Sequence, residues 1–118
     1  MSIEKSLQTV LTTVCPRVRA TVADHGMAAP FIVWQTIGGE PINAMDNSLP
    51  GQRRPLVQIS VWASSQLEAQ TLAQDAEAAL RASNLFTATP SGEAITAPYE
   101  PDTKRYGTIR RFNIWGDR

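Results

Sequence analysis

The sequence is poor in the residues that catalysis and metal binding rely on. Its 118 residues include one cysteine, Cys15, and one histidine, His25. One cysteine excludes a disulfide within the chain and fits a reducing compartment. The same scarcity excludes a zinc site rich in histidine or cysteine. A nucleophilic pair would have to join Cys15, near the end of a predicted helix, to His25 in a polar loop, and no third residue that could orient them is evident. We therefore expect no enzyme, no metal and no cofactor, and we assign no role to either residue.

Excess charge and long apolar runs are missing as well. Eleven Lys and Arg residues offset eleven Asp and Glu residues, so the formal net charge is zero. A dedicated nucleic-acid binder usually carries a strong positive excess, which disfavours that function. No run of about 18 apolar residues predicts a transmembrane helix. The first five residues lack the basic region and apolar stretch of a signal peptide.

What remains is the composition of a folded domain. Hydrophobic residues make up 42% of the chain and charged residues 19%. This is too apolar for a disordered chain, and the length suffices for one ordinary core. We expect a single domain over residues 1–118.

Two amphipathic helices are predicted. The first covers residues 2–15, capped by Ser2 and stopped by Pro16. The second covers residues 65–83, where Ser65 and Glu68 have the spacing of a capping box and Asn84 is a candidate C-terminal cap. Its apolar positions are mostly alanine, so it can approach a sheet closely.

Strands are predicted over residues 31–37, 56–63, 85–89 and 106–115. Residues 56–63 alternate clearly, with one face apolar and the other carrying Trp62. We nevertheless expect Trp62 to be buried where the second helix meets its strand, or at a subunit contact. Residues 17–20 and 95–97 can add short strands. The fold class is therefore α+β, with a mainly antiparallel sheet of about four to five strands and two helices packed on one face.

The long loop over residues 38–55 is rich in glycine, proline and asparagine. It exceeds the usual length of a structureless connection in a compact domain. Two interpretations stay open: a flexible hairpin, or an arm that becomes ordered against another subunit.

Several of these features occur together in one known family. A short first helix precedes Ala29-Pro30-Phe31-Ile32-Val33-Trp34. A strand that ends in Trp62-Ala63 leads directly into an alanine-rich helix. A closing strand carries Tyr106, Arg110, Arg111, Ile114 and Trp115. In this order, the chain resembles the phage tail-completion proteins found in prophages, which are similar to lambda-type tail terminators.

The resemblance implies a structural role rather than a chemical one. Such proteins complete or terminate the tail tube and help to form the head–tail joint, assembling as rings that are often hexamers. The implied partners are further copies of the chain, the tail tube protein and head–tail connector proteins, with DNA only as cargo passing through the ring and no membrane. The implied location is the bacterial host cytoplasm during assembly and then the virion tail.

Arginines near apolar anchors are the candidate contact residues, because arginine is enriched at interface hot spots. The candidates are Arg53, Arg54, Arg110 and Arg111, together with Asp46 as an acidic partner that a neighbouring subunit could supply. Arg53 and Arg54 lie at the base of the long loop, where we expect them to be exposed, and strand alternation turns either Arg110 or Arg111 away from the core.

The basic stretch over residues 104–111 allows other interpretations. It could contact a nucleic-acid backbone, or its arginines could pair with Glu68, Asp75 and Glu77 or with a neighbouring subunit. The alternative function is accordingly a small stand-alone α+β domain that binds nucleic acid or a small ligand.

Overall fold

The chain forms two helices and a curled, mostly antiparallel sheet in the computed structural model, which describes residues 2–24, 26–102 and 104–117. The elements in chain order are α1 (Ile3–Thr12), β1 (Val18–Ala20), β2 (Phe31–Gly39), β3 (Gln52–Arg53), β4 (Pro55–Ala63), α2 (Gln66–Ala82), β5 (Phe86–Pro90), β6 (Ile95–Glu100) and β7 (Arg105–Asp117). The α+β class is confirmed. The described residues form seven strands, more than the four to five expected. The strands β1 and β6 are the short additions that residues 17–20 and 95–97 allowed, whereas the two-residue strand β3 lies in the predicted loop and was not predicted.

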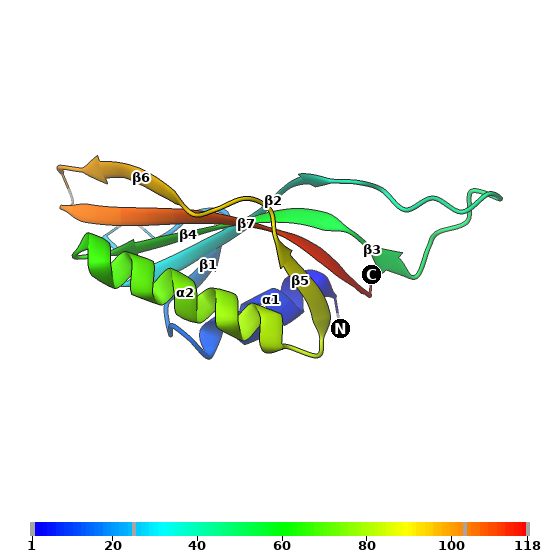
Figure 1. Ribbon diagram of the computed structural model, residues 1–118, viewed down its shortest axis with the longest axis horizontal. Helices are drawn as coiled ribbons and strands as arrows, with labels where there is room; N and C mark the ends of the chain where they lie inside the picture. The colour runs from blue at the N-terminus through cyan, green and yellow to red at the C-terminus, as the bar shows by residue number, and fades with distance from the viewer. Residues whose placement is uncertain (1, 25, 103, 118) are drawn as a thin grey trace.

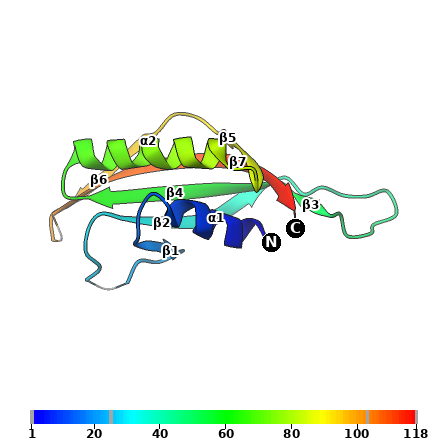
Figure 2. The same cartoon turned by 90° about the horizontal axis from the view of Figure 1, so that it is seen from below.

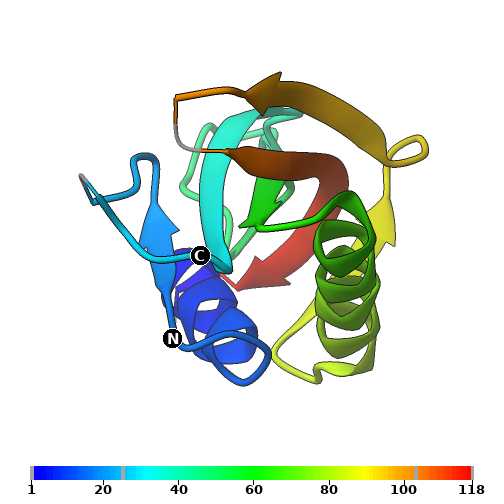
Figure 3. The same ribbon diagram turned by 90° about the vertical axis from the view of Figure 1, so that its left-hand side faces the viewer.

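The long closing strand β7 organises the sheet. The order of strands is β1-β2-β4-β7-β3, and β5 and β6 also pair with β7. Both β4 and β5 pair with Asn113, so they lie on opposite edges of β7. Only the β1–β2 pair is parallel among the described strands. Seen end-on, the sheet curls around, with both helices on one side of it (Figure 3).

Local signals set the helix ends. The Ser2 hydroxyl accepts a hydrogen bond from the Lys5 amide, and the Ser65 hydroxyl accepts one from the Glu68 amide at 3.1 Å, as the capping patterns predict. The helix α1 ends at Thr12, before the predicted residue 15. Ser83, not the predicted Asn84, is the C-terminal cap of α2, because its extended backbone (φ −67°, ψ 139°) ends the helix one residue earlier.

The core lies between the helices and the strands β2, β4 and β7. As predicted, β4 alternates, and its side chains that face the helices are buried: Val57, Ile59, Val61 and Ala63. Small side chains of α2 bring it close to the sheet, and they are Ala69, Ala73 and Ala76. Trp62 lies on the other face and is half-buried. The expectation that it packs where α2 meets β4 is therefore wrong, because strand alternation turns it away from the helices.

The long loop is shorter than predicted. The strand β2 continues to Gly39 and β4 begins at Pro55, while Gln52 and Arg53 form β3. This leaves residues 40–51, here called the arm. The arm extends far beyond the rest of the molecule (Figures 1 and 2). With the arm included, the molecule has principal extents of 52 × 26 × 23 Å.

Candidate partner-binding surfaces

The base of the arm is held by strand pairing and by glycine. The register of β2 and β4 shifts between Thr36 and Gly38, and Gly39 has a φ of +121°. A Cβ atom on Gly39 would lie 2.5 Å from the carbonyl oxygen of Arg54, so only glycine fits here. On the other side, β3 pairs Gln52 with Asp117 and Arg53 with Gly116. These contacts direct the arm away from the body.

Arg53 ties the arm base to the first helix. Its Nη1 atom lies 2.7 Å from Oε1 of Glu4, and the two side chains are 28% and 37% exposed. Arg53 is thus half-buried, which differs from the expected exposure, because β3 pairs with β7 beside α1. Burial of Glu4 opposes its ionisation, but hydrogen bonds from Arg53 and the backbone, together with the charge of Arg53, lower the pKa of Glu4 overall.

Arg54 is more exposed and lies on the opposite face of the sheet. Its guanidinium is 5.2 Å from the ring centre of Trp115, a cation–π geometry. Its Nη2 atom is 3.8 Å from Oε2 of Glu40, which is largely exposed. A partner could therefore reach both the cation and the indole ring.

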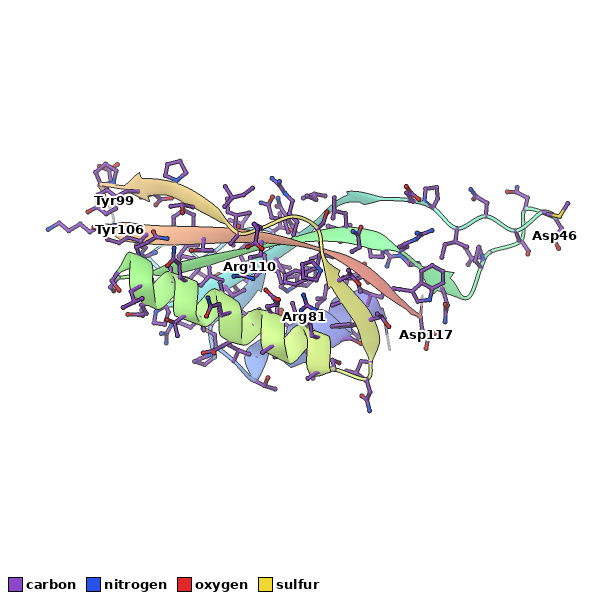
Figure 4. All side chains as sticks on the ribbon, in the orientation of Figure 1. Asp46, Arg81, Tyr99, Tyr106, Arg110 and Asp117 are labelled. Atoms are coloured by element: carbon purple, nitrogen blue, oxygen red, sulfur yellow. The ribbon has the colours of Figure 1, made fainter. Side chains whose placement is uncertain are left out.

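The arm exposes apolar side chains together with negative charge. Met45 is fully exposed and Leu49 is largely exposed. Asp46 lies at the tip, far from the rest of the chain (Figure 4). Hydrogen bonds from the Ser48 side chain and from its amide, the latter at 3.0 Å, stabilise the carboxylate and lower the pKa of Asp46 below its ordinary value. The arm is therefore a candidate contact segment.

Arg110 and Arg111 point to opposite faces of the sheet. Arg110 lies between β7 and α2 (Figure 4), where its Nη1 atom pairs with Glu77. Glu77 also pairs with Arg81 at 2.9 Å. This is the intramolecular pairing that the sequence left open for one of these arginines. Arg111 lies on the other face, where its Nε atom donates to Oε1 of Gln58 at 3.2 Å.

The sheet face that points away from both helices is here called the open face. Its side chains in the central strands, assigned by strand alternation and register, include Phe31, Val33, Gln35, Leu56, Gln58, Ser60, Trp62, Ile109, Arg111, Asn113 and Trp115. Many of them are half-buried or exposed. The face therefore offers a mixed apolar and polar surface.

One end of the open face is closed by aromatic packing. A Cβ atom on Gly107 would lie 2.7 Å from the ring of Trp62, so glycine lets this ring lie directly on β7. Arg105 extends across to the ring of Phe31, with its guanidinium carbon 5.0 Å from the ring centre, and it also donates to the carbonyl oxygen of Met27. A shallow hollow lies at this end, beside Val33.

A second hollow lies at the other end of the open face, next to the arm base. It is lined by Arg54, Leu56, Asn113 and Trp115, among others. The sequence did not single out Trp115 as a partner of Arg54. The sequence placed Trp115 in the closing strand, but it did not show that β3 pairs with β7. That pairing brings Arg54 close to Trp115.

The five predicted contact residues do not form one cluster. Arg53 and Arg54 are neighbours at the arm base, and Asp46 lies at the arm tip. Arg110 lies between β7 and α2, and Arg111 lies on the open face. Glu4 and Glu40, which pair with the two arm-base arginines, were not predicted as site residues.

The structure also locates the residues considered for chemistry. Cys15 is buried, with its Sγ atom 3.6 Å from the carbonyl oxygen of Pro30. His25 lies outside the described residues. Within the described ranges, no three His, Cys, Asp or Glu side chains gather in the manner of a metal site. Neither helix among these residues has the length and apolar character needed to cross a membrane.

An open sheet face and a projecting arm characterise this small α+β protein. A family model described as Tail completion protein gp17 matches residues 5–117. The chain belongs to this family of phage tail completion proteins, and its role lies in completing the phage tail. The resemblance seen in the sequence is thereby confirmed. A comparison with curated proteins gave no match.

Proposed function

We propose that the protein ends the tail tube and helps to form the head–tail joint as a ring of identical subunits. The supporting observation is that each subunit exposes two different surfaces, the projecting arm and the open face. A contact between two different surfaces runs head to tail, and it closes into a ring when the rotation per subunit permits. The neighbours of this ring would be the tail tube protein and the head–tail connector proteins, with DNA only passing through it. Assembly would take place in the bacterial host cytoplasm, and the final location would be the virion tail.

The proposed interface residues remain Asp46, Arg53, Arg54, Arg110 and Arg111. Asp46 and Arg54 are exposed, and Arg111 is half-buried on the open face. Arg53 and Arg110 are each held by a carboxylate of their own chain. We expect a partner to contact Asp46, Arg54 and Arg111 directly. We expect Arg53 and Arg110 to position the arm base and β7.

Replacing Arg54 with glutamate tests this proposal. The side chain is exposed and its pairing with Glu40 is long, so Arg54→Glu should leave the fold intact, with a loss of stability of about 1 kcal/mol or less. Like charges would then face each other at the contact, which weakens association. In a phage that lacks the gene, the variant should fail to restore tails of normal length joined to heads, as seen by electron microscopy.

A matched control is Lys104→Glu, the same change of charge at an exposed turn residue before β7. It should restore normal tails. Circular dichroism should show both variants to be folded. A folded Arg54→Glu protein that yields normal, head-joined tails would remove this residue from the interface.

A further inference from the structure

The arm cannot cover its exposed apolar side chains with its own body. The pairing of Gly39 with Pro55 and of β3 with the end of β7 directs it outward (Figure 2). Met45 and Leu49 therefore stay in water in the single chain. Packing such exposed apolar side chains on another surface removes them from water and lowers the free energy.

The charges of the arm and of the open face are complementary. Residues 40–51 contain two acidic residues, Glu40 and Asp46, and no basic residue. In the middle of the open face, the charged side chain is that of Arg111, whose hydrogen-bond acceptor is the neutral amide of Gln58. Glu100 and Arg105 lie at one end of this face, and Glu40 and Arg54 at the other.

Apolar side chains flank this arginine. Ile109 precedes it by two residues on the same face of β7, and Leu56, which pairs with Asn113, lies diagonally across on β4. Both are half-buried. Arginine is enriched at interface hot spots, where neighbouring contacts exclude water.

We propose that the arm of one copy lies across the open face of a second copy, with Asp46 paired to Arg111 and with Met45 and Leu49 packed on Ile109 and Leu56. This inference rests on the proposed ring, because it specifies the contact that joins one subunit to the next. The arm and the open face are different surfaces, so each copy donates an arm to one neighbour and accepts one from the other.

A charge exchange tests the central pair. Asp46→Arg and Arg111→Asp should each weaken self-association by about 30- to 1000-fold, because each places like charges opposite each other. The double variant should regain most of the lost self-association. Light scattering across a range of concentrations measures this association, and electron microscopy shows whether the protein binds to tail ends. Arg111→Gln serves as a fold control, and circular dichroism should match the wild type. Folded single variants with unchanged association, or a folded double variant no better than the singles, would overturn the contact.

Cross-linking locates the arm directly. In a Cys15→Ala background, a Met45→Cys protein is mixed with a Gln58→Cys protein and treated with a short thiol cross-linker under assembly conditions. A matched control replaces Gln58→Cys with Gln70→Cys, at an exposed position on α2. We expect several-fold more cross-linked dimer with Gln58 than with Gln70. An equal or larger yield with Gln70 would overturn the inference.

The two proposals fail in distinguishable ways. Completed tails that carry a ring without the Met45–Gln58 cross-link would overturn the arm contact and leave the proposed function standing. Wild-type protein that never assembles at tail ends would overturn the proposed function, and the arm contact with it.

Discussion

Glu77 connects two arginines that come from different parts of the chain. It pairs with Arg81 one helical turn further along α2 and with Arg110 beneath the helix. The Nε atom of Arg110 is buried and has no hydrogen-bond partner among the described residues. The guanidinium therefore depends on Glu77 for compensation of its charge.

We expect Glu77→Ala to destabilise the protein by about 1–3 kcal/mol, because it leaves a largely buried cation without a partner. Arg81→Ala should cost less than about 0.5 kcal/mol, since this side chain is mostly exposed and its ion pair lies on the helix surface. Urea unfolding followed by circular dichroism measures both. Equal losses for the two variants would show that the Arg110 pair adds no stability.

Two tryptophans on adjacent strands have different environments. Trp34 is buried on the helix side of β2, and its Nε1 atom donates to Oε1 of Gln8 at 2.9 Å. Trp62 is half-buried on the open face, over Gly107. The first ring is part of the core, and the second is available to a partner.

Trp34→Ala should therefore cost about 3–5 kcal/mol, as expected for a large buried side chain. Trp62→Ala should cost less than Trp34→Ala, because its ring already contacts water. Unfolding curves in urea would compare the two variants. If Trp62→Ala proves as costly as Trp34→Ala, the ring is more deeply packed than its position on the open face implies.

At the scale of elements, the contact between α1 and β3 links the start of the chain to the arm base. The ion pair of Glu4 and Arg53 joins them, and the pKa of Glu4 is lowered in the folded protein from its ordinary value of 4.5. A lowered folded-state pKa means that ionised Glu4 stabilises the fold above about pH 4.5. This contribution is lost as the pH falls through the lowered pKa.

We therefore expect wild-type protein to lose stability more steeply than Glu4→Gln when the pH is lowered from about 5 to about 3. The free energy of unfolding in urea, measured across this range, tests it. In an Arg53→Met background, Glu4→Gln should change the pH dependence little. Parallel curves for the wild type and Glu4→Gln would show that the ion pair contributes nothing to the acid response.

At the scale of the whole molecule, the arm gives the protein its elongated shape. Beyond the strand pairs at its base, the arm has few ways to bury apolar surface, as its exposed side chains show. The body has a packed core and paired strands, so the two parts differ in how firmly they are held.

We expect low backbone order only in the arm of the isolated subunit. Order parameters from NMR relaxation should fall below about 0.6 over residues 40–51 and stay near about 0.85 in β2, β3 and β4. Gly38, Gly39 and residues 52–55, which the sequence assigned to the loop, should be as rigid as the strands that contain or adjoin them. Rigid values over residues 40–51 in a monomer would show that the arm is ordered before any partner binds.

The sequence by itself determined the features that depend on neighbours along the chain. Helical spacing and capping residues placed both helices, and period-two alternation separated the two faces of β4, because these signals act within a few residues. It also carried the resemblance to the tail completion family. The exact ends of the helices were predicted less accurately, because small differences in backbone conformation decide them. For example, Ser83 and not Asn84 is the C-terminal cap of α2.

Tertiary structure alone decided which distant residues meet. The pairing of β3 with the end of β7 shortens the loop to the arm. It also places Arg53, which is half-buried, beside Glu4, and it brings Arg54 over the ring of Trp115. Strand alternation requires the side chains of Arg110 and Arg111 to point to opposite faces of the sheet. Only the packing of α2 on the sheet determines that Arg110 pairs with Glu77 and that Arg111 lies on the open face. The physical reason is that strand register and the direction of a helix across a sheet are set by the packing of the whole core, which no local stretch of sequence encodes.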